Sequence, residues 1–163
     1  MKLRRLELKD APLMLEWMHD PTVVKYMQTN FNQKTLEDCE LFIRNSWNDK
    51  QNLHLAIADE QDIYMGTVSL KNIHNSSAEF AITVRASAMG KGYSKNGMRQ
   101  IFDFGKKENG IKNVYWCVSP ENRRAVRFYD KNGYQRVDKN LVDHKGYTMD
   151  QVNSFIWYQK SLF

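Results

Sequence analysis

Long apolar stretches and blocks of like charge are both missing from this 163-residue sequence. The longest uninterrupted apolar run, Val114 to Val118, is far shorter than the roughly 20 residues of a membrane-spanning helix. No apolar stretch follows the basic start of the chain, so we expect neither a membrane span nor a secretory signal. Repeats, low-complexity segments and linkers are also missing, which predicts one domain over residues 1–163.

Cysteine and histidine are too scarce and too scattered to suggest a disulfide framework or a metal site. The two cysteines, Cys39 and Cys117, lie in dissimilar contexts, and no Cys/His pair has the spacing of zinc ligands. Isolated cysteines of this kind are typical of reduced, partly buried thiols in a reducing compartment. We therefore expect a cytoplasmic protein that needs no metal.

What the sequence does have is ordinary for a folded soluble protein: 42% hydrophobic, 12% aromatic and 26% charged residues. The formal net charge of +5 fits either a mildly basic protein or one that binds an anionic ligand. If the ligand is anionic, nucleic acid is disfavoured, because no block of five or six basic residues occurs. Charge alone does not decide between them.

Periodicity and turn signals predict alternating strands and helices. Asp10 and Pro12 mark a helix start, Thr35 to Asp38 resembles a capping box, and Asn132-Gly133 is a typical helix stop. The predicted strands are 2–8, 53–58, 63–71, 78–84, 112–118, 134–138 and 153–160, and the later helices are 93–108 and 121–131. This order, β-α-α-β-β-β-α-β-α-β-β, predicts an α/β (α+β) fold with a mixed, mostly antiparallel sheet flanked by helices.

The loop between Val84 and Ser94 is the first candidate site. Gly90 and Gly92 let the backbone approach a ligand closely, and free N–H groups at the start of the following helix attract phosphate. Arg85 stands where a Walker loop needs glycine, and Lys95 stands where a dinucleotide fingerprint needs one. Two interpretations of the loop remain: a turn that binds a pyrophosphate without either signature, and a connector that binds no ligand.

The second candidate site is the helix that follows Pro120. Asn122, Ala125 and Tyr129 share one helix face, where a small residue lets a ligand lie close and a phenol is available to a leaving group. The alternative makes Asn122 a helix cap and Tyr129 a boundary residue.

Taken together, the two stretches resemble the GCN5-related N-acetyltransferases. The acyl-CoA signature Gln/Arg-x-x-Gly-x-Gly/Ala falls on residues 89–94, with Met89 and Ser94 as departures, and Asn-x-x-Ala-x-x-x-Tyr falls on Asn122 to Tyr129. The opening around residues 17–24 resembles the branch that includes the ribosomal-protein N-acetyltransferases. The resemblance extends over essentially the whole chain and implies a GNAT-type twisted sheet with acetyl-CoA as co-substrate.

The resemblance also implies which residues form the site. The strand before the loop should splay from its neighbour and hold the pantetheine arm through its backbone. Tyr129 should protonate the leaving thiolate, and Glu79 or a water chain should accept the proton of the amine. Glu79 as a solvated strand residue is the alternative. The implied cofactor-binding residues are Ile82, Thr83, Val84, Met89, Gly90, Lys91, Gly92, Tyr93, Ser94, Asn122, Ala125 and Lys131.

The sequence motifs define the acetyl acceptor less closely than the cofactor. We expect an acetyl group to move directly to a primary amine on a peptide N-terminus, an amino sugar or another small molecule. The first two helices, the loop 20–34 between them and the last strands should build its pocket. A non-catalytic acyl-CoA sensor on the same fold and a basic nucleic-acid-binding module are the alternatives, and the family also admits a homodimer.

Overall fold

A seven-stranded sheet of mixed direction organises the protein, whose computed structural model describes residues 1–163. The spatial order is β1-β2-β3-β4-β5-β7-β6, and every neighbouring pair is antiparallel except β4 and β5. The strands are Lys2–Arg5 (β1), Leu53–Ala58 (β2), Tyr64–His74 (β3), Ser77–Val84 (β4), Asn113–Val118 (β5), Gln135–Arg136 (β6) and Ile156–Ser161 (β7). The expected mixed, mostly antiparallel sheet is therefore confirmed.

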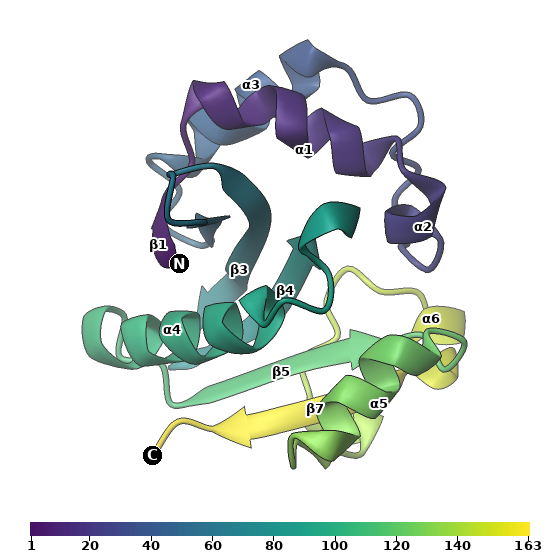
Figure 1. Cartoon of the computed structure of the whole chain (residues 1–163). Coiled ribbons are helices and arrows are strands. Elements are labelled where there is room, and N and C mark those ends of the chain that lie inside the picture. Colours follow the sequence, from purple (N-terminus) through teal and green to yellow (C-terminus); the bar gives the residue numbers. More distant parts are fainter.

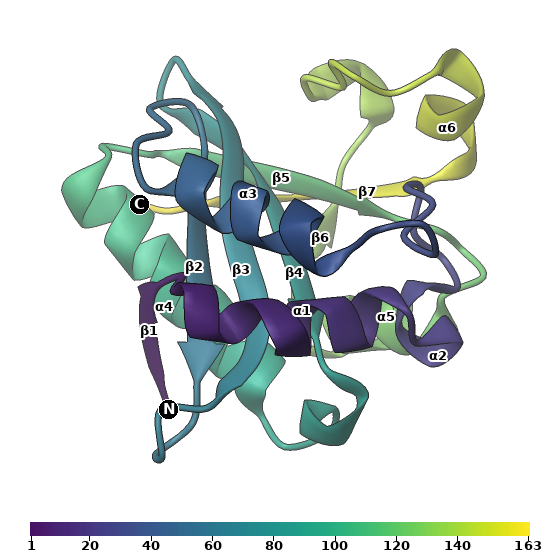
Figure 2. The same ribbon diagram turned by 90° about the horizontal axis from the view of Figure 1, so that it is seen from above.

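Helices cover both faces of the sheet. Figure 1 shows α1 (Ala11–Met18) and α3 (Leu36–Ser46) on one face and α4 (Tyr93–Glu108) on the other. The short helix α2 (Pro21–Val24) follows α1, and α5 (Arg123–Lys131) connects β5 to β6. Seen from above, α1 and α3 lie across β2 to β4, whereas α6 (Met149–Ser154) lies at the far end of the sheet (Figure 2). No helix combines the length and the apolar character that a membrane crossing requires.

The alternation of side chains along β4 separates the two faces. Phe80 and Val84 belong to the larger core cluster, which includes the buried residues of α4, and Ile82 packs against it. Glu79 points to the opposite face, as successive residues of a strand do. One side of β4 therefore packs into the core beneath α4, and the other side, which carries Glu79, faces α1, α3 and α6.

Several local predictions are confirmed. The strand 53–58 and the helix 93–108 have the expected bounds. Thr35 and Asp38 form the expected capping box at the start of α3. At the end of α5, Gly133 has φ +79°, and the Gly133 and Tyr134 N–H groups donate to the carbonyls of Asp130 and Tyr129. That pair of bonds is a Schellman motif, which the Asn-Gly pair predicted.

Other expectations are wrong for physical reasons. The first strand ends at Arg5, and the Asp10 side chain does not cap α1. Asp10 is instead buried and accepts two hydrogen bonds from the guanidinium of Arg4, each 2.8 Å long, a bidentate charge-assisted pair. The strand predicted at 134–138 keeps only two residues, because Asp138 caps a short 3₁₀ helix. The helix α6 was not predicted.

Candidate active site

The candidate site begins at a gap between two neighbouring strands. β4 pairs with β5 only from Ser77 to Glu79. Beyond Glu79, β4 keeps its pairing with β3 as far as Val84, and β5 keeps its pairing with β7 as far as Val118. The two strands diverge from this point, as Figure 1 shows. The expected arm-binding residues Ile82 to Val84 lie along this unpaired edge, where backbone polar groups are free for a ligand.

The loop at the end of β4 presents a row of free backbone donors. Gly90 and Gly92 have φ of +76° and +86°, a left-handed conformation that favours glycine. Gly92 is the N-cap of α4 and supplies no side-chain cap. The backbone N–H groups from Gly90 to Lys95 donate to no atom of the chain. Consecutive free N–H groups at a helix start attract an anion, and phosphate in particular.

Arg124 extends from α5 across the gap to this loop. Its Nη1 lies 3.1 Å from the sulfur of Met89, and its Nη2 lies 3.8 Å from where a Cβ on Gly90 would stand. Arg124 was not among the predicted site residues. The cluster of arginines at 123, 124 and 127 in the sequence was the available signal. The side chain adds a permanent positive charge beside the free N–H groups.

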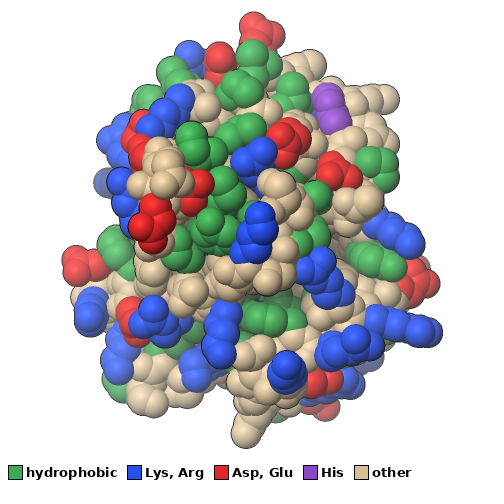
Figure 3. Space-filling model, viewed as in Figure 1, with side chains coloured by type: hydrophobic (Ala, Val, Ile, Leu, Met, Phe, Trp, Pro, Cys, Tyr) green, Lys and Arg blue, Asp and Glu red, His purple; other side chains and the backbone are tan.

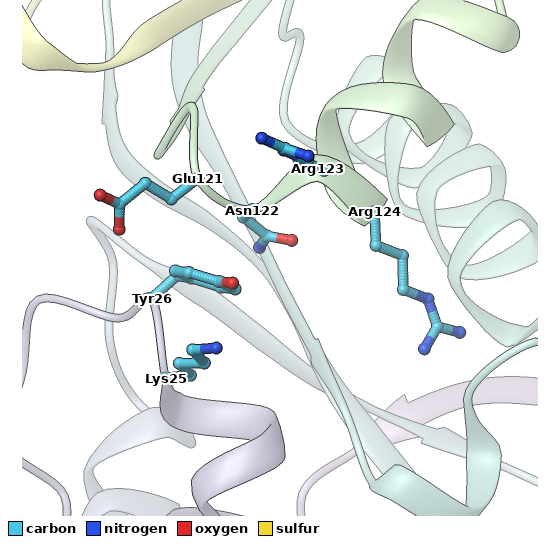
Figure 4. Close-up of a pocket in the computed structure, with 6 residues that line it drawn as sticks. All are labelled: Lys25, Tyr26, Glu121, Asn122, Arg123 and Arg124. Carbon is cyan, nitrogen blue, oxygen red and sulfur yellow. The ribbon is translucent and has the colours of Figure 1, made fainter.

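The start of α5 also borders an open cavity of about 540 Å³, shown in Figure 4. Residues at the end of α2 and the start of α5 form its walls, and their side chains include three cations and one carboxylate. The lining residues are Lys25, Tyr26, Glu121, Asn122, Arg123 and Arg124. Figure 3 shows that Lys and Arg side chains are frequent on the surface around α5. The excess of positive charge here favours an anionic ligand.

Asn122 has a structural role in this wall. Its side-chain oxygen accepts a hydrogen bond of 3.2 Å from the N–H of Ala125 and so caps α5. In Figure 4 the amide lies between Tyr26 and Arg124, on the cavity side of the helix. The cap described as the alternative for Asn122 is present, and the side chain borders the cavity as well.

Tyr129 lies about two turns further along α5 and is buried, with 8% of its surface exposed. Its ring packs against Trp116 and Tyr158, with ring centroids 5.3 and 5.1 Å away. The hydroxyl makes no hydrogen bond within the chain. Burial raises the pKa of Tyr129 above its ordinary value near 10, because the phenolate would lose its hydration. A neutral phenol with a free hydroxyl can therefore donate a proton from this position.

Not every expected cofactor residue lies at the cavity. Lys131 is at the opposite end of α5 and lines a second, smaller cavity of about 390 Å³ together with Arg127. Lys91 is exposed on the glycine loop, and Tyr93 and Ser94 are half-buried at the start of α4. The structure thus brings the loop and the start of α5 together, and it places Lys131 apart from them.

Glu79 occupies the closed end of the gap, where β4 and β5 part. Only 4% of its surface is exposed, so the expected alternative of a solvated strand residue is wrong. Its Oε1 accepts a hydrogen bond from the Tyr147 hydroxyl and lies 3.4 Å from the Lys71 ammonium. Its Oε2 accepts a bond of 3.4 Å from the Asn72 amide. A buried carboxylate needs such partners, because an unpaired charge is strongly unfavourable in the interior.

The sequence reasoning missed Tyr147, which comes from the segment before α6. The Tyr147 ring meets the rings of Phe155 and Trp157 edge-on, with centroids 6.3 and 5.4 Å away. The half-buried Cys117 belongs to the same cluster. Burial raises the pKa of Cys117 to about 11. The capping box of Thr148 and Gln151, which fixes the start of α6, was the local signal that could have revealed this segment.

The loop after α2 meets α6 on this same side. The Gln151 amide donates a hydrogen bond of 3.0 Å to the side-chain oxygen of Gln28, which joins residues far apart in the sequence. The loop 20–34, which was expected to help build the acceptor pocket, is therefore in contact with α6, a helix that was not predicted. Two carboxylates, one on β4 and one on α1, are paired with cations: Glu79 with Lys71, and Glu16 with Arg85 through two bonds of 2.8 and 3.0 Å.

Comparison with known proteins identifies relatives of this chain. The profile of a family described as "Acetyltransferase (GNAT) domain" matches residues 1–135. An uncharacterized N-acetyltransferase p20 from Bacillus licheniformis is 25% identical over 139 residues, which cover 82% of this chain and 78% of that protein. Spermidine N(1)-acetyltransferase from Escherichia coli K12 is 23% identical over 134 residues, which cover 82% and 72% of the two chains.

Solved structures show the same fold. The spermidine N-acetyltransferase from Vibrio cholerae, solved in complex with CoA and spermine, superposes with a TM-score of 0.80. The match covers 99% of this chain and 95% of that one at 19% identity. A GNAT-family acetyltransferase from Bacillus anthracis gives a TM-score of 0.75 at 21% identity and covers 98% and 93% of the two chains. At such identities the likeness establishes the architecture.

Proposed function

The chain belongs to the GNAT acetyltransferase family, and from that premise we propose that it moves an acetyl group from acetyl-CoA to a primary amine. The row of free N–H groups from Gly90 to Lys95, beside the unpaired edges of β4 and β5, carries the proposal. We also propose that residues 1–163 act as a single N-acetyltransferase domain. In support, β7 lies inside the sheet, between β5 and β6, although it follows the residues that the family profile matches.

The residues around the gap fit acetyl-CoA. The free N–H groups of the glycine loop suit its pyrophosphate, with Arg124 and Lys91 as nearby cations. The unpaired backbone of Ile82 to Val84 suits the amide groups of its pantetheine arm. Ala125 is small enough for the arm to pass beside α5. Met89 replaces the usual glutamine or arginine without loss in this scheme, because binding relies on main-chain N–H groups.

The chemistry assigned to this chain is proton transfer and charge stabilisation. Acetyl-CoA supplies an activated thioester, which a neutral amine attacks directly. At pH 7 only the neutral fraction of an amine with a pKa of about 8 to 10 attacks, and its nitrogen loses a further proton as the amide forms, which a group on the enzyme must accept. Glu79, directly or through water, is that group. Tyr129 donates a proton to the departing thiolate, and the free N–H groups of β4 stabilise the developing oxyanion.

For the acceptor we propose an amine that carries a single positive charge, such as a peptide N-terminus or an amino sugar. Two relatives are named as spermidine acetyltransferases, so polyamines are the obvious comparison. Recognition of a polycation favours several unpaired carboxylates. Glu79 and Glu16 are each paired with a cation of the chain, and the cavity at α5 has three cations against one carboxylate.

A panel of amines tests the proposal. The protein and acetyl-CoA are incubated with spermidine, a peptide with a free N-terminus, the same peptide with a blocked one, and an amino sugar. Free CoA thiol is then measured. We expect thiol release with the singly charged amines and none with the blocked peptide. CoA binding, measured by the rise in melting temperature, combined with no turnover of any amine would identify an acyl-CoA sensor and refute an enzyme.

A further inference from the structure

The position of Glu79 raises a difficulty for a direct role as base. Its side chain is 5% exposed, and both of its oxygens already have partners from the chain. The Tyr147 hydroxyl occupies Oε1, the oxygen that also faces Lys71. An acceptor amine therefore reaches Oε1 of Glu79 only by displacing the Tyr147 hydroxyl.

Tyr147 is the more accessible partner of the buried carboxylate. It is only half-buried, unlike Glu79, so part of it remains accessible. The edge-on contacts with Phe155 and Trp157 fix the plane of its ring. Its segment leads directly into α6, whose Gln151 contacts Gln28 of the loop expected to bind the acceptor. The Tyr147 hydroxyl thus contacts Glu79 from a segment whose helix is bonded to the loop expected to help bind the acceptor.

We propose that Tyr147 relays the proton of the acceptor amine to Glu79. This proposal rests on the proposed acetyltransferase function. As the nitrogen of the neutral amine bonds to the acetyl carbon, the thioester C–S bond breaks and the departing thiolate takes the proton of Tyr129. The N–H bond of the amine breaks, and a new O–H bond forms on the Tyr147 oxygen. The original Tyr147 O–H bond breaks in the same step, and that proton bonds to Oε1 of Glu79. The nitrogen loses one proton, Glu79 gains one, and Tyr147 is unchanged.

The surrounding groups favour this route over others. Burial, together with the nearby Cys117 and Glu79, raises the pKa of Tyr147 well above its ordinary value, so a concerted relay avoids a free phenolate. The thiol of Cys117 stays protonated near neutral pH, because its pKa is about 11. Tyr115, which is paired with Glu79 across the two strands, makes no hydrogen bond to the carboxylate. The Lys71 ammonium balances the charge of the carboxylate before the transfer.

The first test is a double-mutant cycle on turnover with Tyr147→Phe, Glu79→Gln and the combined variant. Because both residues act in one proton path, each single change should lower kcat by about 10²- to 10⁴-fold. The combined variant should lose no more than the worse single variant, since the path is already broken. KM for both substrates should stay within about threefold. Tyr115→Phe, the same change next to Glu79, is the matched control and should keep kcat.

The second measurement is independent of acetyl-CoA. Urea unfolding is measured for the wild type, the two single variants and the combined variant. The two substitutions should be coupled by about tenfold or more in the unfolding equilibrium constant, as expected for a hydrogen bond to a carboxylate. Coupling in stability with losses in kcat that multiply would mean that the pair is structural, and it would overturn the relay. A lack of coupling in stability would overturn it too.

The two proposals fail in different ways. If the wild-type protein acetylates an amine and Tyr147→Phe does so within threefold of its rate, the relay alone is wrong. If the wild-type protein acetylates no amine although the stability cycle shows the pair, the proposed function is wrong and the relay falls with it.

Discussion

The free hydroxyl of Tyr129 allows a sharp test of its expected role as the acid. The change Tyr129→Phe removes one oxygen and leaves the ring in contact with Trp116 and Tyr158. No hydrogen bond within the chain is lost, since the hydroxyl makes none. We therefore expect the free energy of unfolding and the affinity for CoA to change little, by less than about 1 kcal/mol.

Turnover should respond very differently. A positioned general acid contributes about 10²- to 10⁴-fold to the rate, which corresponds to roughly 3 to 5 kcal/mol of transition-state stabilisation. Because burial raises the pKa of Tyr129, the phenol remains protonated well above neutral pH, and the effect should persist across that range. Single-turnover rates are the proper measure, since slow product release would mask part of the loss.

A neighbouring tyrosine supplies the control. The Tyr134 ring centroid lies 6.1 Å from that of Tyr129, and Tyr134→Phe makes the same chemical change beside the same aromatic cluster. We expect it to keep the single-turnover rate. A rate for Tyr129→Phe within about threefold of the wild-type rate would refute the assignment and leave Tyr129 as a packing residue.

Three further predictions concern the cofactor site and the response to pH. Gly92→Val should abolish the rise in melting temperature that CoA produces. Gly110→Val is the control: it imposes a similar left-handed strain of about 1–2 kcal/mol at the other end of α4, where an added Cβ contacts no atom. This variant should still show the rise in melting temperature with CoA. Arg124→Ala should raise the Kd for CoA about tenfold in calorimetry, while Arg44→Ala on α3 leaves it unchanged. Burial lowers the pKa of His54. The charge of Lys71 lowers this pKa further, and the charge of Asp49 partly opposes the shift. The unfolded chain therefore binds a proton near pH 6.5 before the folded one does, and stability should fall as the pH drops through that value. Urea unfolding at several pH values should show a smaller fall for His54→Gln.

Local signals were enough for much of the fold. The helix 93–108 begins after Gly92 and carries its own apolar period, so its bounds depend on neighbours along the chain. The strand 53–58 alternates and ends in a polar turn, and it too was predicted with its observed bounds. The same holds for Gly133, whose left-handed φ completes the Schellman motif. Elements of this kind are fixed by residues within a few positions of one another.

The parts that sequence reasoning missed depend on distant contacts. Tyr147 and Glu79 are 68 positions apart, and nothing near either residue indicates that their side chains meet. Asp10 has the residue type and the position of a helix cap, but Arg4 on β1 offers a bidentate partner that the backbone cannot match. The contact between Arg124 and the glycine loop exists because the β5–α5 turn returns across the gap.

The gap between β4 and β5 makes the sheet weakest in its middle. Three residue pairs, Ser77 to Glu79 with Asn113 to Tyr115, join the two halves through backbone bonds, and beyond them packing such as the contact of Phe80 with Trp116 must hold the halves together. A ligand whose amide groups bond to both edges would act as an extra strand. Amide hydrogen exchange should therefore be fast along these edges in the free protein and slow when the gap is filled. Occupancy of the site would then stiffen the junction between the two halves of the sheet and raise the resistance of the protein to proteolysis.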